Sequence, residues 1–258
     1  MFEQGKVFTF VALVVTMGII LLEIVRTRGG AKVSIRKIAG VAAIEESIGR
    51  ATEMGRPVHY CPGAGDLYGG SSPQTLAGLQ ILSYVTRTAA RYNTRLIVTT
   101  SMPDTYAAAD EVVKHGYVEA NRAEAYSADD VRFISTDQWA FAAGAIGIIN
   151  RDSVAANMLL GQFAAESLLL AEAGNKAGAI QIAGTTNMYQ IPYFVAACDY
   201  TVIGEELFAA GAEFSQNPVE LGSLVGEDWA KIAAVALMVL GVLTSTFGSS
   251  IIVDLIKR

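Results

Sequence analysis

The glycine-rich segment from Cys61 to Pro73 has the residue types in this sequence that are most suggestive of ligand binding. It reads Cys-Pro-Gly-Ala-Gly-Asp-Leu-Tyr-Gly-Gly-Ser-Ser-Pro, and it follows a predicted strand and precedes a predicted helix. Glycines at such a position let the backbone approach a phosphate, and ligands of open α/β sheets bind at this edge. However, the spacing of Gly63, Gly65 and Gly69 differs from G-x-G-x-x-G, and no G-x-x-x-x-G-K-[ST] occurs.

Two further polar turns are expected at the same edge of the sheet. They are Thr99–Ser101 and Gly184–Asn187, whose hydroxyl and amide groups can line a polar pocket or cap helices. Asp66 would repel a phosphate, and no acidic residue directly ends the second strand to hold a ribose. A tight connection or a subunit contact is therefore the alternative to a binding site. The candidate ligand-binding residues are Gly63, Gly65, Asp66, Thr100 and Asn187.

The carboxylates of the chain do not form a recognisable catalytic arrangement. Asp137 and the pair Glu205-Glu206 have no evident proton-transfer partner, and neither a Ser/His/Asp order nor a G-x-S-x-G turn is present. Glu205 and Glu206 are predicted to begin a helix, where negative charge suits the local dipole. The sequence therefore predicts no catalytic residue.

The histidines and cysteines do not indicate a metal site. His59 and His115 share no ligand spacing, and no Cys-x-x-Cys occurs. Cys61 and Cys198 lie among apolar or small residues, which predicts buried, reduced thiols. We expect neither a metal nor another cofactor.

Composition places the protein in a membrane. The hydrophobic fraction is 52% and the mean hydropathy is +0.38, and most of the excess lies in the runs Val7–Val25 and Ile232–Val253. Each run approaches the roughly 20 apolar residues that cross a bilayer, so we predict two membrane helices and the lipid bilayer as a partner. The net charge of −6 and the pI of about 5.0 argue against binding to nucleic acid.

The distribution of basic residues predicts the orientation. Arg26, Arg28 and Arg36 follow the first run with two lysines, whereas Lys6 alone precedes it. This bias predicts a cytoplasmic central domain at the cell membrane. Lys257 and Arg258 would then lie outside, a mild conflict that a re-entrant or interfacial second segment would remove. The expected division is 1–30 for the first anchor, 31–226 for the domain and 227–258 for the second anchor.

The central region alternates between predicted helices and strands. This pattern predicts an α/β fold, a three-layer Rossmann-like domain with a mostly parallel sheet of five strands. The predicted strands are Pro57–Cys61, Arg95–Thr100, Val131–Ile134, Ala179–Ala183 and Tyr200–Ile203. The predicted helices are Ala42–Met54, Pro73–Tyr92, Pro103–His115, Ser153–Ala173 and Met188–Ala197, with Asn150–Ser153 capping the fourth.

Small residues are abundant in three further segments. Trp139–Ile149 is apolar on every side of a helix, and Phe208–Ala212 is nearly uncharged. Such surfaces favour burial between subunits, with burial in the domain core as the alternative for Trp139–Ile149. Thr244–Ser250 contains small and hydroxylated residues that permit close helix packing in the membrane.

The central stretch resembles a family of uncharacterised prokaryotic membrane-anchored proteins that is classed as a domain of unknown function. The resemblance is carried by Glu45–His59, Cys61–Gly65 and Thr201–Leu207, and it covers about Val41 to Ser215. It implies membrane anchoring but supplies no reaction and no catalytic residue.

These observations lead to three functional hypotheses. The leading one is a non-enzymatic, self-associating scaffold, a homo-oligomer with its α/β domains at the cytoplasmic face. The second is a nucleotide-binding or small-molecule-binding domain tethered to the membrane, which includes an enzyme. The third is an accessory subunit of a larger membrane complex.

Overall fold

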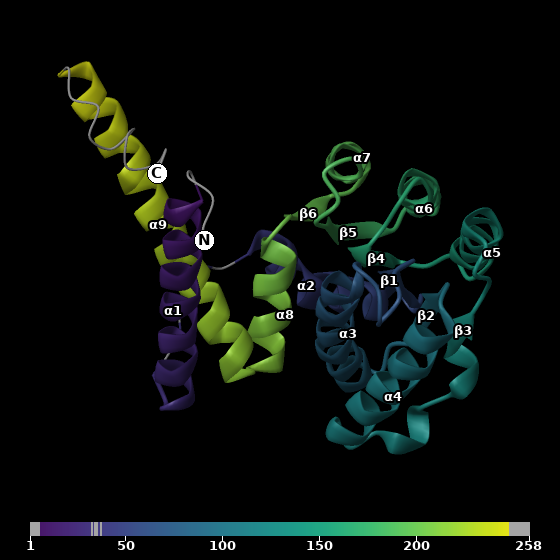
Figure 1. Ribbon diagram of the computed structural model, residues 1–258. Coiled ribbons are helices and arrows are strands. Elements are labelled where there is room, and N and C mark those ends of the chain that lie inside the picture. Colours follow the sequence, from purple (N-terminus) through teal and green to yellow (C-terminus); the bar gives the residue numbers. More distant parts are fainter. Residues whose placement is uncertain (1–5, 32, 34–35, 37, 248–258) are drawn as a thin grey trace. The chain divides into compact units, whose positions relative to one another are not determined.

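The computed structural model describes residues 6–31, 33, 36 and 38–247 (Figure 1). The chain forms two compact units. One contains residues 36–215, and the other combines residues 1–35 with residues 216–258.

The unit 36–215 is an α/β domain built on a parallel sheet. Its six strands lie in the order β3-β2-β1-β4-β5-β6, and every neighbouring pair is parallel. The strands are β1 Val58–Gly63, β2 Leu96–Thr100, β3 Val131–Phe133, β4 Ala156–Gln162, β5 Ile180–Thr185 and β6 Tyr200–Ile203. The helices are α2 Ala39–Met54, α3 Ser72–Tyr92, α4 Pro103–Glu119, α5 Gln138–Arg151, α6 Glu166–Lys176, α7 Ile191–Ala197 and α8 Glu206–Ser215. Two short 3₁₀ turns, η1 Ala123–Ala125 and η2 Ala128–Asp130, connect α4 to β3.

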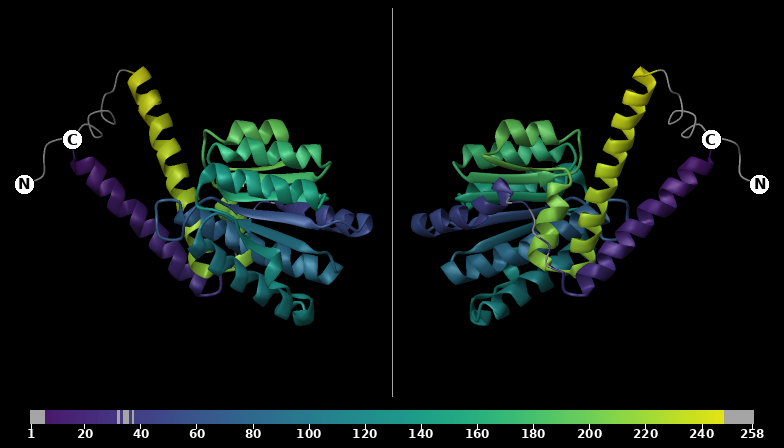
Figure 2. Two further views of the ribbon diagram at one scale, coloured as in Figure 1. Left: turned by 90° about the vertical axis from the view of Figure 1, so that its right-hand side faces the viewer. Right: turned by 90° about the vertical axis from the view of Figure 1, so that its left-hand side faces the viewer.

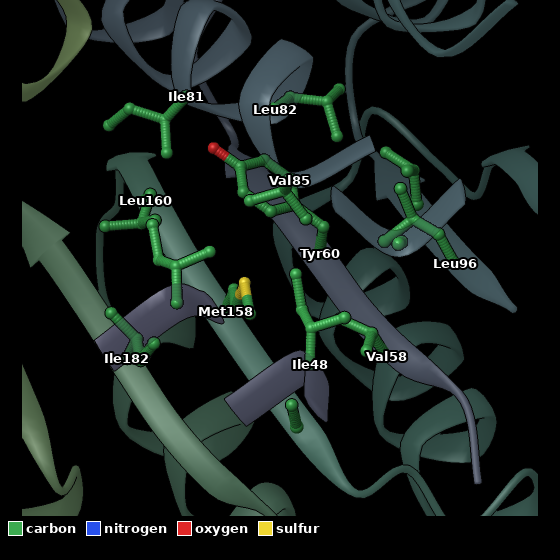
Figure 3. Packing of buried hydrophobic residues seen from close by; sticks show 14 of the residues in the cluster. Ile48, Val58, Tyr60, Ile81, Leu82, Val85, Leu96, Met158, Leu160 and Ile182 are labelled. Atoms are coloured by element: carbon green, nitrogen blue, oxygen red, sulfur yellow. The ribbon is translucent and has the colours of Figure 1, made fainter. Parts of the chain in front are cut away.

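Helices cover both faces of this sheet, so the domain has three layers (Figure 2). Side chains alternate across β1: Val58 and Tyr60 belong to the core beneath α2, α3, α4 and α8, whereas Cys61 belongs to the core beneath α5, α6 and α7. In the first core the ring of Tyr60 lies among aliphatic side chains, including Ile48 and Met158 (Figure 3). The Tyr60 hydroxyl donates a hydrogen bond of 2.5 Å to the Gly78 carbonyl oxygen, so this buried polar atom is satisfied.

The α/β architecture and the parallel sheet are confirmed, but the predicted count of five strands is wrong. The missed strand is β4, which lies within the segment 153–173 that was predicted to be one helix. β4 is almost fully buried and reads Ala-Asn-Met-Leu-Leu-Gly-Gln, and a short buried apolar run cannot be told from a helix by its periodicity. The predicted cap Asn150–Ser153 is instead the turn that ends α5, with Ser153 at φ +47°.

The apolar segment Trp139–Ile149 lies within α5 and has two distinct sides. Phe141, Ala145 and Ile149 belong to the second core, whereas Trp139 is exposed. Burial in the domain core therefore accounts for one side of this helix.

The second unit contains α1 (Val7–Arg28) and α9 (Pro218–Thr246), the two described helices that are long and apolar enough to cross a membrane. Their most apolar windows are not buried within the structure, unlike the core helix of a soluble protein. α9 begins well before the predicted apolar run and continues to Thr246; residues 248–253 of that run lie outside the described part.

α1 and α9 pack side by side as an antiparallel pair (Figure 1). A Cβ atom added to Gly222 would lie 2.6 Å from the Ile24 Cα, and one added to Gly226 would lie 2.6 Å from the Ile20 Cα. These glycines form a small-xxx-small pair that lets two backbones meet. Within the segment Thr244–Ser250, predicted to pack closely, Thr244 Oγ1 donates 2.9 Å to the carbonyl of Leu240 in its own helix, and residues 248–250 lie outside the described part.

Gly226→Leu should weaken the α1–α9 pair by about 1–3 kcal/mol, because the new side chain would overlap the backbone of α1. The measurement is an SDS titration of the full chain in mild detergent, followed by Trp229 fluorescence in a Trp139→Phe background. Gly18→Leu is the matched control, since a Cβ at Gly18 has no atom within 4 Å. Equal midpoints for the two leucine variants would contradict the described packing.

Candidate functional site

All five candidate ligand-binding residues lie at the carboxyl edge of the sheet. Gly63 ends β1 and Thr100 ends β2, the strand beside it. Gly65 and Asp66 lie in the segment between β1 and α3, whereas Asn187 lies between β5 and α7, two strands away from β1. The fold thus places these residues at one edge, where α/β sheets bind ligands.

The crevice expected at this edge is filled by backbone. The sheet order changes direction between β1 and β4, which is where the carboxyl ends of the strands separate in dinucleotide-binding sheets. Here the two strands stay paired beyond a register shift: Gly63 pairs with Gln162, and the Ala64 N–H donates 2.8 Å to the Gln162 carbonyl. A Cβ on Gly161 would lie 1.9 Å from the Pro62 carbonyl oxygen. The backbones of β1 and β4 therefore occupy the space between them.

The glycine-rich segment is held by hydrogen bonds within the domain. Asp66 Oδ1 accepts from the Gly69 N–H at 2.9 Å and from the Ser71 hydroxyl at 3.2 Å. Asp104, at the start of α4, accepts from the Leu67 N–H at 2.8 Å. The Thr105 hydroxyl donates 2.9 Å to the Gly65 carbonyl. The role of Asp66 in ordering this segment was not evident from its position in the sequence.

Thr100 and Asn187 also have partners within the chain. Thr100 Oγ1 makes a weak bond of 3.4 Å to the Arg132 carbonyl. Asn187 donates 2.9 Å to the Phe163 carbonyl and accepts 3.1 Å from the Tyr189 N–H. Asn187 thereby joins the segment after β5 to the segment after β4.

Carboxylates already occupy the N-termini of two helices at this edge, α5 and α6. Asp137 caps α5 by accepting from the backbone N–H groups of Trp139 and Ala140. Glu166, fully buried in the first turn of α6, accepts 2.9 Å from the Ala164 N–H and 2.5 Å from the Gln138 amide. Negative side chains at these positions satisfy the N–H groups and the local dipole that a bound phosphate would use.

One buried hydroxyl at the edge has no hydrogen-bond partner. Ser101, directly after β2, is 2% exposed, and its Oγ is unpaired, as is the buried Oε1 of Gln74 in α3. Unsatisfied buried polar atoms are rare in native structures. These two buried atoms could form hydrogen bonds with a ligand at this edge.

A buried polar network that the sequence did not reveal crosses the sheet beneath α6. His59, Asn157 and Gln181 are in register on neighbouring strands β1, β4 and β5. His59 Nδ1 lies 2.7 Å from Asn157 Oδ1, the Asn157 amide donates 2.8 Å to Gln181 Oε1, and Gln181 donates 2.8 Å to the Ala197 carbonyl. His59 Nε2 lies 2.9 Å from Thr99 Oγ1.

The directions of these hydrogen bonds determine the tautomer of His59. Because the Asn157 amide nitrogen donates to Gln181, the Asn157 oxygen must accept from Nδ1–H of His59, and Nε2 accepts from the Thr99 hydroxyl. Burial lowers the pKa of His59 to about 4, so the imidazole is neutral at physiological pH. Each of these polar side chains is at most 2% exposed, which suits a structural role.

A model of the family Domain of unknown function (DUF6754) matches residues 1–256. The chain belongs to this family. The match covers both units described above, and it includes the helices α1 and α9 as well as the α/β domain. No curated protein and no solved structure matches the chain.

Both cysteines of this family member are free thiols, and they are poor nucleophiles at neutral pH. Cys61 is buried, as predicted, whereas Cys198 is partly exposed. Burial raises the pKa of Cys61 to about 12 and that of Cys198 to about 12. Because the thiolate is the reactive form, neither residue has the environment of a catalytic cysteine. Among the described residues no group of three or more His, Cys, Asp or Glu side chains is placed to hold a metal ion.

Proposed function

We propose that the protein is a membrane-anchored, self-associating scaffold whose α/β unit serves as a rigid binding platform rather than as a reaction centre. The observation that carries this proposal is the contact between the ends of β1 and β4, where backbone fills the usual ligand crevice. The carboxylates at the N-termini of α5 and α6 support it, because they occupy N–H groups there that would otherwise bind an anion.

The anchoring helices support association in the membrane. α9 continues to Thr246, and its last turns extend beyond the start of α1 at Val7 (Figure 1). There the side chains of Leu240 and Leu243 are exposed, and in a bilayer they would face lipid or a helix of another copy. The α/β unit lies on the cytoplasmic side in this proposal, because Arg26 and Arg28 lie in the last turn of α1, at the end that leads to this unit.

Native mass spectrometry of the full chain in mild detergent tests self-association. We expect a defined multiple of the 27.3 kDa chain mass. A monomer without bound protein would contradict the proposal. Co-purification with a different polypeptide in fixed ratio would also contradict it, and would identify an accessory subunit instead.

The unpaired Ser101 hydroxyl favours a second candidate function, the binding of a small polar molecule at the carboxyl edge. In this alternative Gly63, Gly65, Asp66, Thr100 and Asn187 surround the ligand. Thermal-shift measurements of the full chain in detergent, across nucleotides and small polar metabolites, test it. A ligand should raise the melting temperature of the native chain and not of Ser101→Ala, whereas the absence of any shift would remove this alternative.

A further inference from the structure

Large apolar side chains of the α/β unit are exposed mainly at the carboxyl edge of the sheet. Tyr68, after β1, is 90% exposed, and Met188 and Tyr189, after β5, are 81% and 84% exposed. Trp139, in the first turn of α5 after β3, is 58% exposed. We call these four residues, three aromatic side chains and one methionine, the aromatic rim. At the opposite edge, exposed large apolar residues are confined to the last turns of α2, α3 and α4, namely Met54, Tyr92 and Val118.

The basic residues of the unit have the opposite distribution. Between residues 38 and 215, all of which the structure describes, no Lys or Arg occurs in the segments that follow the carboxyl ends of the strands. The Lys and Arg residues of this range are Arg50, Arg56, Arg87, Arg91, Arg95, Lys114, Arg122, Arg132, Arg151 and Lys176. Asp66 and Asp137 lie two positions before the rim residues Tyr68 and Trp139 in the sequence. Apart from Arg36, which is paired with Glu206, the edge is therefore apolar and acidic, and it would be attracted to neutral rather than anionic surfaces.

The chain enters the α/β unit at this same edge. Arg36 pairs with Glu206, at the start of α8, at 2.7 Å, and Ile38 is buried in the first core. A Cβ on Gly40 would lie 2.7 Å from a side-chain atom of Val202 in β6, so α2 begins against this strand. Only residues 29–35 separate α1 from Arg36, a segment that spans at most about 25 Å when fully extended. A bilayer that holds α1 is thus within reach of this edge.

We propose that the aromatic rim docks on the bilayer surface, at the level of neutral, zwitterionic headgroups. Tyr and Trp have an apolar body and a polar tip, and both are enriched at membrane interfaces. Met188 adds a flexible apolar side chain. This lipid contact does not require the proposed self-association. It would hold the carboxyl edge against the membrane and leave the opposite edge, with the basic residues, facing the cytoplasm.

Trp139 can report on this contact, because the chain has only two tryptophans. The experiment uses full-length Trp229→Phe protein in phosphatidylcholine vesicles with brominated acyl chains near the headgroup. We expect strong quenching of Trp139 by the brominated lipid and protection from acrylamide in the water. Replacing a third of the lipid with phosphatidylglycerol should reduce the lipid quenching, because Asp66 and Asp137 would be repelled.

Matched variants separate the rim from general effects on the domain. Met188→Ser combined with Tyr189→Ser should lower the lipid quenching of Trp139 by roughly twofold or more, since two interfacial contacts are lost. Met54→Ser, which changes an exposed methionine at the opposite edge, should leave it unchanged. The Trp139→Phe protein, with Trp229 in α9, provides the control for membrane insertion.

Three outcomes would overturn the proposal. Trp139 quenched by acrylamide but not by lipid would mean that the rim faces water. Trp139 protected from both quenchers, with protection that is lost as the protein-to-lipid ratio falls, would mean that a second copy covers the rim. Absence of lipid quenching at both tryptophans would refute membrane insertion together with the lipid contact.

Discussion

Gly161→Ala should strongly destabilise the α/β unit, although the substitution adds a single methyl group. The added Cβ would lie 1.9 Å from the Pro62 carbonyl oxygen, and Gly161 has φ +153°, a conformation that side chains rarely adopt. The obstacle is backbone, so no side-chain rotation can relieve the overlap. We expect a loss of about 4 kcal/mol or more, which is a large part of the stability of a typical domain.

The measurement for Gly161→Ala is the urea midpoint of the full chain in mild detergent, followed by Trp139 fluorescence in a Trp229→Phe background. Gly147→Ala is the matched control. Gly147 lies inside α5 with no atom within 4 Å of the added Cβ, so alanine there should be neutral or stabilise the helix by up to about 1 kcal/mol. If Gly161→Ala unfolded at the native midpoint, the ends of β1 and β4 could not be as close as described.

Removing the imidazole of His59 should destabilise the domain strongly and change its response to acid. His59→Leu would leave the Asn157 oxygen without its donor in the core and would remove the imidazole bond of the Thr99 hydroxyl, at a cost of about 2–4 kcal/mol. Asn157 and Gln181 are packed beneath Gly174 of α6, where an added Cβ would lie within 2.5 Å of both side chains. The helix therefore leaves little room for water to replace the lost partners.

The pH dependence follows from the pKa of His59, which is about 4 in the folded state against 6.5 for an unperturbed histidine. Between these values the unfolded chain binds a proton that the native chain does not. The free energy of unfolding therefore falls as the pH is lowered from about 6.5 to 4, by about 3 kcal/mol, and this contribution is fully present above pH 6.5.

Urea unfolding at several pH values between 7.5 and 4 tests this linkage. His59→Gln should abolish the histidine contribution, so the difference in stability from the native chain should shrink as the pH falls. His115→Gln is the control, because His115 is the other histidine and is exposed on α4. Parallel pH profiles for the native and His59→Gln proteins would show that His59 is not buried in the neutral form.

Much of the α/β fold could be predicted from local sequence patterns. β6 was predicted with the bounds that the structure has, and the predicted end of α2 at Gly55 is confirmed by its left-handed conformation, φ +62°. These elements are marked by β-branched residues or by a glycine at the end of an amphipathic helix, both of which act locally. β4 lacked such a pattern because both of its faces are buried.

The candidate site shows the same limit. The sequence could assign Gly63, Thr100 and Asn187 to one edge, because the carboxyl ends of parallel strands share an edge. It could not show that the backbone of β4 fills the crevice beside Gly63, since β4 itself was not recognised. The polar network has one sequence signal, a polar residue at the second position of β1, β4 and β5, which becomes visible only when all three strands are assigned.

The sequence by itself determined that this chain has two helices suited to a bilayer and a parallel α/β domain between them, because hydropathy and periodicity are properties of neighbouring residues. The tertiary structure alone decided which strands adjoin. It thereby determined that Gly161 contacts Pro62, that His59 is buried and hydrogen-bonded to Asn157, and that Tyr68 and Trp139 share an edge. These relations join residues far apart in the chain, and they depend on sheet order and register, which no local pattern encodes.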